Sequence, residues 1–159
     1  MSTASLWQNA LIRATRLTHK PVLALPILVL LSGCSGTAPD NLGIREGRLT
    51  ACPDSPNCVN SQASDERHAI EPLPLKGSAE ETQARLKALL SEEPRATLVE
   101  EAPGYLRAEF SSKLMRFVDD VEFMIGGAAV DVRSASRLGY ADFDVNRERI
   151  EHLRQRLSE

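Results

Sequence analysis

The chain has 159 residues, with 19 lysines and arginines against 22 aspartates and glutamates, which gives a formal net charge of −3. A chain of this length suits one domain that buries its own core. The acidic balance argues against nucleic acid as a partner, because binding to phosphates depends on an excess of basic side chains.

Residues 1–33 have the pattern of a secretory signal peptide. A region with three basic and no acidic residues precedes an uninterrupted apolar run over residues 21–31. This run is shorter than the roughly twenty residues that cross a bilayer as a helix. Leu31-Ser32-Gly33-Cys34 then resembles the lipobox of bacterial lipoproteins, in which the cysteine is acylated and becomes the first residue of the mature protein. The alternative is an ordinary cleaved signal peptide followed by a free cysteine.

Acylation at Cys34 would place the protein in the cell envelope. Two or more acyl chains on one residue anchor a protein stably, so the domain needs no membrane-binding face of its own. Ser35 stands where lipoproteins of the inner membrane tend to have Asp, which favours the outer membrane, with the domain facing the periplasm. Cleavage removes three of the 19 basic residues and none of the 22 acidic ones, so the mature net charge is −6.

Residues 34–49 are polar and contain Gly and Pro, a composition typical of a flexible tether, and the domain is expected over residues 50–159. Cys52 and Cys58 enclose a short loop. An even pair of cysteines in an exported chain predicts a disulfide. The alternative, a metal or redox site, lacks the Cys-x-x-Cys spacing and a further Cys or His cluster.

The next elements are an extended segment and a helix. Residues 68–75 contain two prolines and form at most an edge strand, because proline cannot donate a hydrogen bond to a sheet. Ser78 and Glu81 have the spacing of a capping box at the start of a helix. Its leucine stripe predicts a buried face, and the helix should end before Pro94.

Alternating apolar residues then predict strands and a last helix. Strands are expected over residues 97–101, 105–110 and 115–125, and a further one through Val130 and Val132, with turns at Ala102-Pro103-Gly104 and Gly126-Gly127. Asp144 and Asn146 are plausible N-caps of the last helix, which has an apolar stripe. This order predicts an α+β domain, with a small antiparallel sheet of three to five strands and helices packed on one face.

Four segments resemble a known family. They read C-P-D-S-P-N-C-V-N-S, R-F-V-D-D-V-E-F, V-R-S-A-S-R-L-G and D-F-D-V-N-R-E-R-I, and with their spacing they cover residues 51–157. The chain resembles the family called domain of unknown function 1499, which supplies no activity. The resemblance implies that a set of polar residues belongs to the family's shared pattern: Asp119, Asp120, Glu122, Arg133, Ser134, Ser136, Arg137, Asn146 and Arg147.

These residues are the candidate ligand-binding residues. Arg133 and Arg137 are suited to hold a small anionic group, with Ser134 and Ser136 donating beside them. The alternative is an ion-pair network that ties the sheet to the last helix.

Alternation places Asp119 on the apolar face of its strand. It places Asp120 and Glu122 on the opposite, solvent-side face, where Arg133 can pair with either. The acidic trio would therefore need a bulge to bind a divalent metal, and no metal site or cofactor is predicted.

No catalytic constellation is recognisable in the sequence. His68 opens a loop, His152 lies among charged helical residues, and neither joins Ser134 in a known motif. Asp142-x-Asp144-x-Asn146 resembles the start of a calcium loop but lacks the loop's glycine and closing glutamate.

The sequence therefore predicts a lipid-anchored envelope protein with a non-enzymatic binding or assembly role. Its expected partners are the membrane, through lipidated Cys34, and an envelope protein or a small anionic ligand. The alternative is an envelope hydrolase or ligand-binding domain that uses the same polar cluster as its site.

Overall fold

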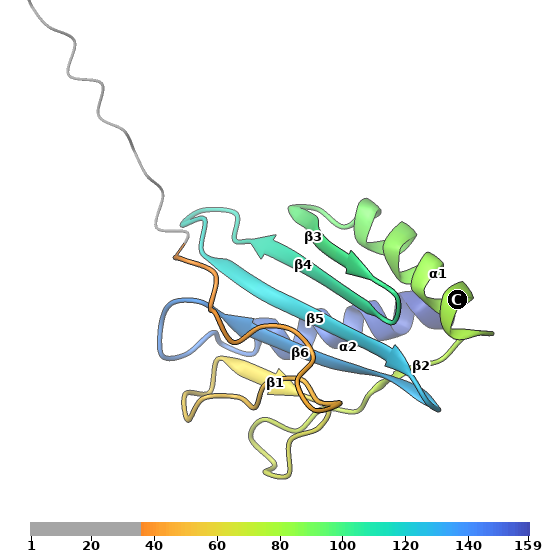
Figure 1. The fold of residues 1–159 in the computed structure, drawn as a ribbon. Coiled ribbons are helices and arrows are strands. Elements are labelled where there is room, and N and C mark those ends of the chain that lie inside the picture. Colours follow the sequence, from red (N-terminus) through yellow and green to blue (C-terminus); the bar gives the residue numbers. More distant parts are fainter. Residues whose placement is uncertain (1–35) are drawn as a thin grey trace, which may run out of the picture. The chain divides into compact units, whose positions relative to one another are not determined.

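The computed structural model describes residues 36–159, so the signal peptide and the predicted lipidation site at Cys34 lie outside the described residues. Residues 36–159 form six strands and two helices (Figure 1). In chain order these are β1 (Cys58–Asn60), β2 (Leu73–Pro74), α1 (Ala79–Glu92), β3 (Ala96–Ala102), β4 (Tyr105–Ser111), β5 (Val118–Gly126), β6 (Ala129–Ser136) and α2 (Val145–Ser158).

One antiparallel sheet contains all the strands, in the order β1-β6-β5-β4-β3, and β2 pairs with β6 as well. The predicted α+β class is confirmed, but the sheet has six strands rather than three to five. The extra strands are β1 and β2. They have three residues and two residues, too few to produce a periodic pattern, and only their pairing with β6 defines them.

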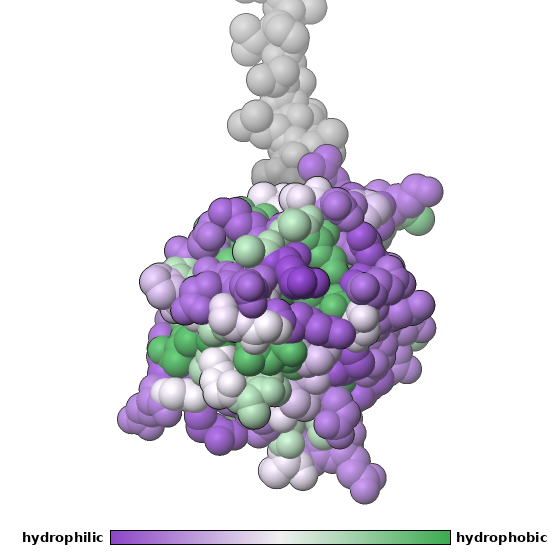
Figure 2. Space-filling model, turned by 90° about the vertical axis from the view of Figure 1, so that its right-hand side faces the viewer, coloured by the Kyte–Doolittle hydropathy of each residue, from purple (hydrophilic) through white to green (hydrophobic). Residues whose placement is uncertain are grey.

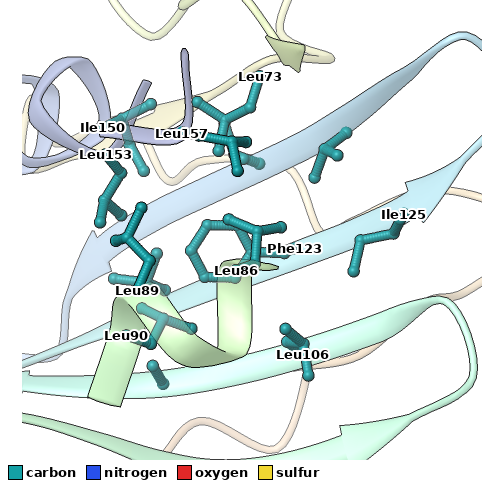
Figure 3. Close-up of a cluster of buried hydrophobic side chains, with 14 of the residues drawn as sticks. Leu73, Leu86, Leu89, Leu90, Leu106, Phe123, Ile125, Ile150, Leu153 and Leu157 are labelled. Atoms are coloured by element: carbon teal, nitrogen blue, oxygen red, sulfur yellow. The ribbon is translucent and has the colours of Figure 1, made fainter. Parts of the chain in front are cut away.

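The apolar residues gather between the helices and one face of the sheet (Figure 3). Leu86 and Leu90 of α1 and Leu153 of α2 join the same cluster as Val121 and Phe123 of β5. We call this face of the sheet the core face and the opposite one the polar face. At the end of the domain with the β5–β6 turn, the surface has hydrophilic residues around smaller apolar patches (Figure 2). Full burial of one such leucine or phenylalanine contributes about 1.5–3 kcal/mol relative to exposure.

Helix α1 begins and ends where the sequence predicts. The Ser78 hydroxyl accepts a hydrogen bond from the backbone N of Glu81 (3.2 Å), and the Glu81 carboxylate accepts one from the backbone N of Ser78 (2.8 Å). This capping box satisfies two N–H groups that have no partner within the helix. The helix ends at Glu92, two residues before Pro94, because a proline disfavours the helical conformation in the residue that precedes it.

Strand β5 begins at Val118 and not at Met115, so the predicted start is wrong. The loop before it is closed by two hydrogen bonds, from Ser112 N to Phe117 O (2.8 Å) and from Phe117 N to the Ser112 hydroxyl (2.9 Å). Arg116 within this loop has a left-handed φ of 56°. The alternation of apolar residues therefore extends beyond the strand into a loop that exposes Met115 and Phe117.

Of the two predicted N-caps of α2, Asp144 occupies the cap position and Asn146 does not. The side chain of Asp144 makes no capping hydrogen bond, however, and its φ is 65°. Asp142 supplies the bond instead, because its Oδ2 accepts from the backbone N of Asn146 (2.9 Å). Asn146 is not a cap but a fully buried residue in the first turn of the helix.

The first described residues contact the polar face of the sheet (Figure 1). The backbone N of Gly43 donates to Oε1 of Glu122 in β5 (2.7 Å), and Leu49 is buried. These contacts lie in the stretch that the sequence predicts as a tether. The predicted disulfide between Cys52 and Cys58 is present and joins this segment to β1. Within residues 36–159, no helix is both long and apolar enough to cross a membrane.

Candidate functional site

The candidate residues divide between the two faces of the sheet, because successive strand residues point to opposite sides. Asp119, Ser134 and Ser136 lie on the core face, where Ser134 and Ser136 meet Asn146 of α2. The polar face carries a second group, which consists of Asp120, Glu122, Arg133 and Arg137. Arg147 joins neither group, because its guanidinium donates to the backbone oxygens of Arg67 (3.0 Å) and Ala69 (2.8 Å).

The core-face group connects β5 and β6 to α2. The Ser134 hydroxyl donates to Oδ1 of Asn146, and Arg149 donates to the same oxygen (2.7 Å) and to the Ser134 hydroxyl (3.0 Å). A second N–H of Arg149 donates to Asp119, and its guanidinium lies 4.8 Å from the ring centroid of Phe110. The predicted pairing of sheet and last helix is therefore made by Asp119 with Arg149.

The Asn146 amide completes this group. Its Nδ2 donates to Asp142 Oδ2 (2.7 Å), to the Ser136 hydroxyl (3.0 Å) and to the backbone oxygen of Asn57 (3.1 Å). A buried amide with all these partners holds the start of α2, β6 and the segment before β1 together. Because these polar groups already form hydrogen bonds with one another, they have few donors or acceptors left to bind a ligand.

The polar-face group consists of alternating acids and arginines. Asp120 and Glu122 were expected on the solvent side, but they are only 1% and 0% exposed. They do lie on the face opposite to Asp119, as alternation predicts. They are buried because residues 36–53 contact this face, and a segment so far away in the sequence gives no local signal of that contact.

Arg137 is the most completely bonded arginine of this group. Its Nε donates to Oδ2 of Asp120 (2.7 Å) and its Nη2 to Oδ1 (2.8 Å), a two-pronged pairing, and Nη2 also reaches Glu109. Hydrogen bonding to Asp120 is the main reason that the pKa of Arg137 lies above its usual value. Arg137 therefore stays protonated, and its two-pronged pairing with Asp120 holds the end of β6 against β5.

Glu122 is fully buried and accepts three hydrogen bonds. The donors are the backbone N of Gly43 (2.7 Å), the hydroxyl of Tyr105 (2.9 Å) and Nη1 of Arg133 (3.2 Å). Burial, followed by the charge of Glu122, raises the pKa of Tyr105 well above its usual value. The phenol therefore stays protonated and acts as a donor to the carboxylate.

Arg133 differs from Arg137 in having unused donors. Within residues 36–159 its side chain makes one hydrogen bond, to Glu122, and its buried Nε has no partner. A guanidinium has five N–H donors, so residues 36–159 use only a small part of its hydrogen-bonding capacity. Arg133 also lines a cavity of about 260 Å³ on the polar face, together with Asn41, Cys52, Asp120 and Arg137. Oδ1 of Asn41 is a second buried atom without a partner among the described residues.

The arginines near this cavity are all paired with carboxylates. Arg137 pairs with Asp120 and Glu109, Arg133 pairs with Glu122, and Arg107 pairs with Asp120, Glu109 and Glu100. The cavity can therefore offer hydrogen-bond donors to an oxygen without presenting a large net positive charge. Within the described chain, no histidine lines this cavity, and no group of three or more His, Cys, Asp or Glu residues is placed to hold a metal.

The two histidines of the described chain are engaged elsewhere. His68 Nδ1 lies 2.8 Å from Oδ1 of Asp65, and its Nε2 lies 3.2 Å from the backbone oxygen of Ser55. His152 contacts Glu93 (3.0 Å). Ser134 is fully buried and bonds to Asn146 and Arg149, so the structure does not bring Ser134 to either histidine.

Several residues that bond to the candidate residues carry no motif of their own in the sequence. Tyr105, Arg107 and Glu109 alternate along β4, and the register places Arg107 opposite Glu122 and Glu109 opposite Asp120. Correct pairing of the two predicted strands would have found them. Arg149 lies three residues after Asn146, on the same side of a helix, which is a weaker signal.

The family model described as "Protein of unknown function (DUF1499)" matches residues 48–157 of the chain. No curated protein and no solved structure matches it.

Proposed function

The chain belongs to the DUF1499 family of proteins of unknown function, and on that premise we propose a function from its own residues. The protein is a lipid-anchored component of the cell envelope, most simply on the periplasmic side of the outer membrane. Its domain binds a small ligand or a partner's polar group without catalysing a reaction. The Leu31-Ser32-Gly33-Cys34 sequence supports the anchor, and the Cys52–Cys58 disulfide supports an oxidising compartment.

The binding proposal rests on one observation, the unused donors of Arg133 at the cavity of about 260 Å³. A buried donor without a partner costs about 1–3 kcal/mol. A ligand oxygen of a carboxylate, phosphate or carbonyl group would supply the missing acceptor. Because the arginines near the cavity are already paired with carboxylates, the site favours a ligand with one such group over a highly charged anion.

The anchor is tested by metabolic labelling with palmitate. The wild-type protein should incorporate the label, and Cys34→Ser should abolish incorporation because the acylated thiol is gone. Cys52→Ser is the matched control, since the same change at a disulfide cysteine should leave labelling intact. Equal labelling of Cys34→Ser and the wild type would disprove the anchor.

The ligand is tested by native mass spectrometry of the protein purified from its own envelope. The wild type should retain a small molecule, and Arg133→Lys should lose it, because lysine keeps the charge beside Glu122 but lacks the additional planar donors. Arg147→Lys is the control, since Arg147 bonds to backbone oxygens away from the cavity. The binding proposal would be contradicted if the Arg133→Lys variant retained the ligand, or if the wild-type protein carried no ligand.

A further inference from the structure

Two loops of the domain expose large apolar side chains to an unusual degree. The first loop covers residues 112–117, between β4 and β5, and the second covers residues 137–144, between β6 and α2. Their exposed apolar residues are Leu114 (87% exposed), Met115 (64%), Phe117 (39%), Leu138 (43%), Tyr140 (72%) and Phe143 (91%). Single exposed apolar residues are ordinary, but a cluster of them indicates a surface that another body covers.

The two loops lie at the same end of the sheet. β5 begins where β6 ends, because Asp119 pairs with Ser136 and the backbone N of Arg137 donates to Val118 O (3.0 Å). In Figure 1 both loops lie on the left, away from the β5–β6 turn. We call this part of the domain the apolar end. The opposite end faces the viewer in Figure 2, where hydrophilic residues surround smaller apolar patches.

The described chain also starts at the apolar end. A Cβ atom built on Gly36 would lie 3.2 Å from Cγ of Leu138 and 3.1 Å from Cβ of Arg137, so the backbone of Gly36 contacts the second loop. Cys34 is two residues earlier in the sequence. Two residues span at most about 7 Å. An acyl group on Cys34 would therefore be attached beside the exposed apolar side chains.

We propose that the apolar end docks on the surface of the lipid bilayer in which the protein is anchored. This inference rests on the proposed acylation of Cys34. An amphipathic helix on a bilayer buries its apolar face about 5–10 Å, at the boundary of headgroups and acyl chains, and the apolar side chains of the two loops would occupy the same depth. Lys113 and Arg116 alternate with the apolar residues of the first loop and can reach lipid phosphates. Asp142 and Asp144 offset their charge, so the apolar side chains supply most of the attraction.

The main effect of the docking is to orient the domain, and it contributes less to holding the domain at the membrane. Acyl chains alone are sufficient for stable anchoring. With the apolar end on the bilayer, the β5–β6 turn at the opposite end points away from the lipid. The backbone of the second loop fits this display, because Phe143 and Asp144 both have left-handed φ values, of 55° and 65°. A bulky residue such as phenylalanine seldom adopts this conformation.

An introduced tryptophan tests the docking directly. The only tryptophan of the chain is Trp7, which cleavage before Cys34 would remove. Phe143→Trp or Leu114→Trp would then be the sole indole of the mature protein. The full-length lipoprotein is processed in cells, purified in acylated form and reconstituted into phosphatidylcholine vesicles with or without brominated acyl chains. We expect emission at shorter wavelength and loss of intensity in the brominated vesicles.

Ala128→Trp is the matched control, because Ala128 is exposed in the β5–β6 turn at the opposite end. Its emission should be the same in both kinds of vesicle. Equal quenching of Trp at 128 and at 143, or no quenching at 143, overturns the docking. A blue shift at 143 without bromine quenching, together with cross-linked dimers, also overturns it and indicates a second copy of the chain as the occupant.

These outcomes separate the docking from the anchor. Palmitate labelling with no bromine quenching at position 143 disproves the docking alone. If the wild-type protein incorporates no palmitate, the anchor on which the docking rests is disproved. The melting temperature of each tryptophan variant should match that of the wild type, because both loop positions are exposed.

Discussion

Single residues of the polar face show how this domain accommodates buried charge. Glu122 is fully buried, yet three donors surround its carboxylate, and one of them, Gly43, lies 79 residues earlier in the chain. An unpaired buried carboxylate would be strongly destabilising. The carboxylate therefore requires the segment that covers it, and this segment buries its own Leu49 in return.

The phenol of Tyr105 should give the domain an alkaline transition. Its pKa is raised in the folded state, so it stabilises the fold fully below the unfolded-state pKa of about 10 and loses that effect as pH rises beyond it. Tyr105 and Tyr140 are the only tyrosines. In a Tyr140→Phe variant, the ultraviolet absorbance of tyrosinate should therefore appear only together with unfolding seen by circular dichroism.

Tyr105→Phe provides the comparison for this prediction. It should remove the steep loss of stability above pH 10 and should cost about 1 kcal/mol at neutral pH, where the hydrogen bond to Glu122 is lost. Ionisation of Tyr105 near pH 10 in a protein that stays folded would contradict the role assigned to the phenol.

At the scale of elements, the start of α2 depends on a residue that lies before the helix cap. Asp142 accepts from both the backbone N (2.9 Å) and the side-chain Nδ2 (2.7 Å) of Asn146, whereas Asp144 makes no capping bond. We expect Asp142→Ala to lower the free energy of unfolding by about 1 kcal/mol or more, the usual effect of losing a cap. Urea denaturation measures this change.

Asp144→Gly is the control for Asp142→Ala. Glycine accepts the left-handed φ of 65° at this position without strain, so stability should be unchanged or slightly higher. A larger loss with Asp144→Gly than with Asp142→Ala would show that the side chain of Asp144, one of the two caps predicted from the sequence, caps the helix after all.

The elements that the sequence predicts well are those with local signals. The capping box at Ser78 and the proline at position 94 define α1, and Pro103-Gly104 marks the β3–β4 turn. β1 and β2 give no such signal, because each is a strand only through its pairing with β6. Alternation correctly separates Asp119 from Asp120 and Glu122. It cannot show that the last two are buried, because the residues that cover them are distant in sequence.

At the scale of the whole molecule, the disulfide joins the covering segment, residues 36–53 over the polar face, to the sheet. Cys52 lies near the end of this segment, and Cys58 is the first residue of β1. A disulfide across so short a loop contributes about 2 kcal/mol in the chain-entropy model. Cys52→Ala with Cys58→Ala should lower the unfolding free energy by about this amount. Hydrogen exchange should then accelerate first at residues 43–50, before the core around Phe123.

The order of exchange is the informative part of this experiment. Uniform acceleration across the sheet, including β5, would show that the covering segment and the core unfold together. Unchanged protection at residues 43–50 would show that the hydrogen bond from Gly43 to Glu122 holds the segment without the disulfide.

If Cys34 is acylated as proposed, the contact between Gly36 and Leu138 limits how far the folded domain can move from the membrane. With an acyl group on Cys34, only about 7 Å of chain would separate the lipid from the folded body. A domain anchored through so short a connection could not reach across the space between two membranes. Anything that enters its cavity must arrive by diffusion or be presented at the surface of the same bilayer.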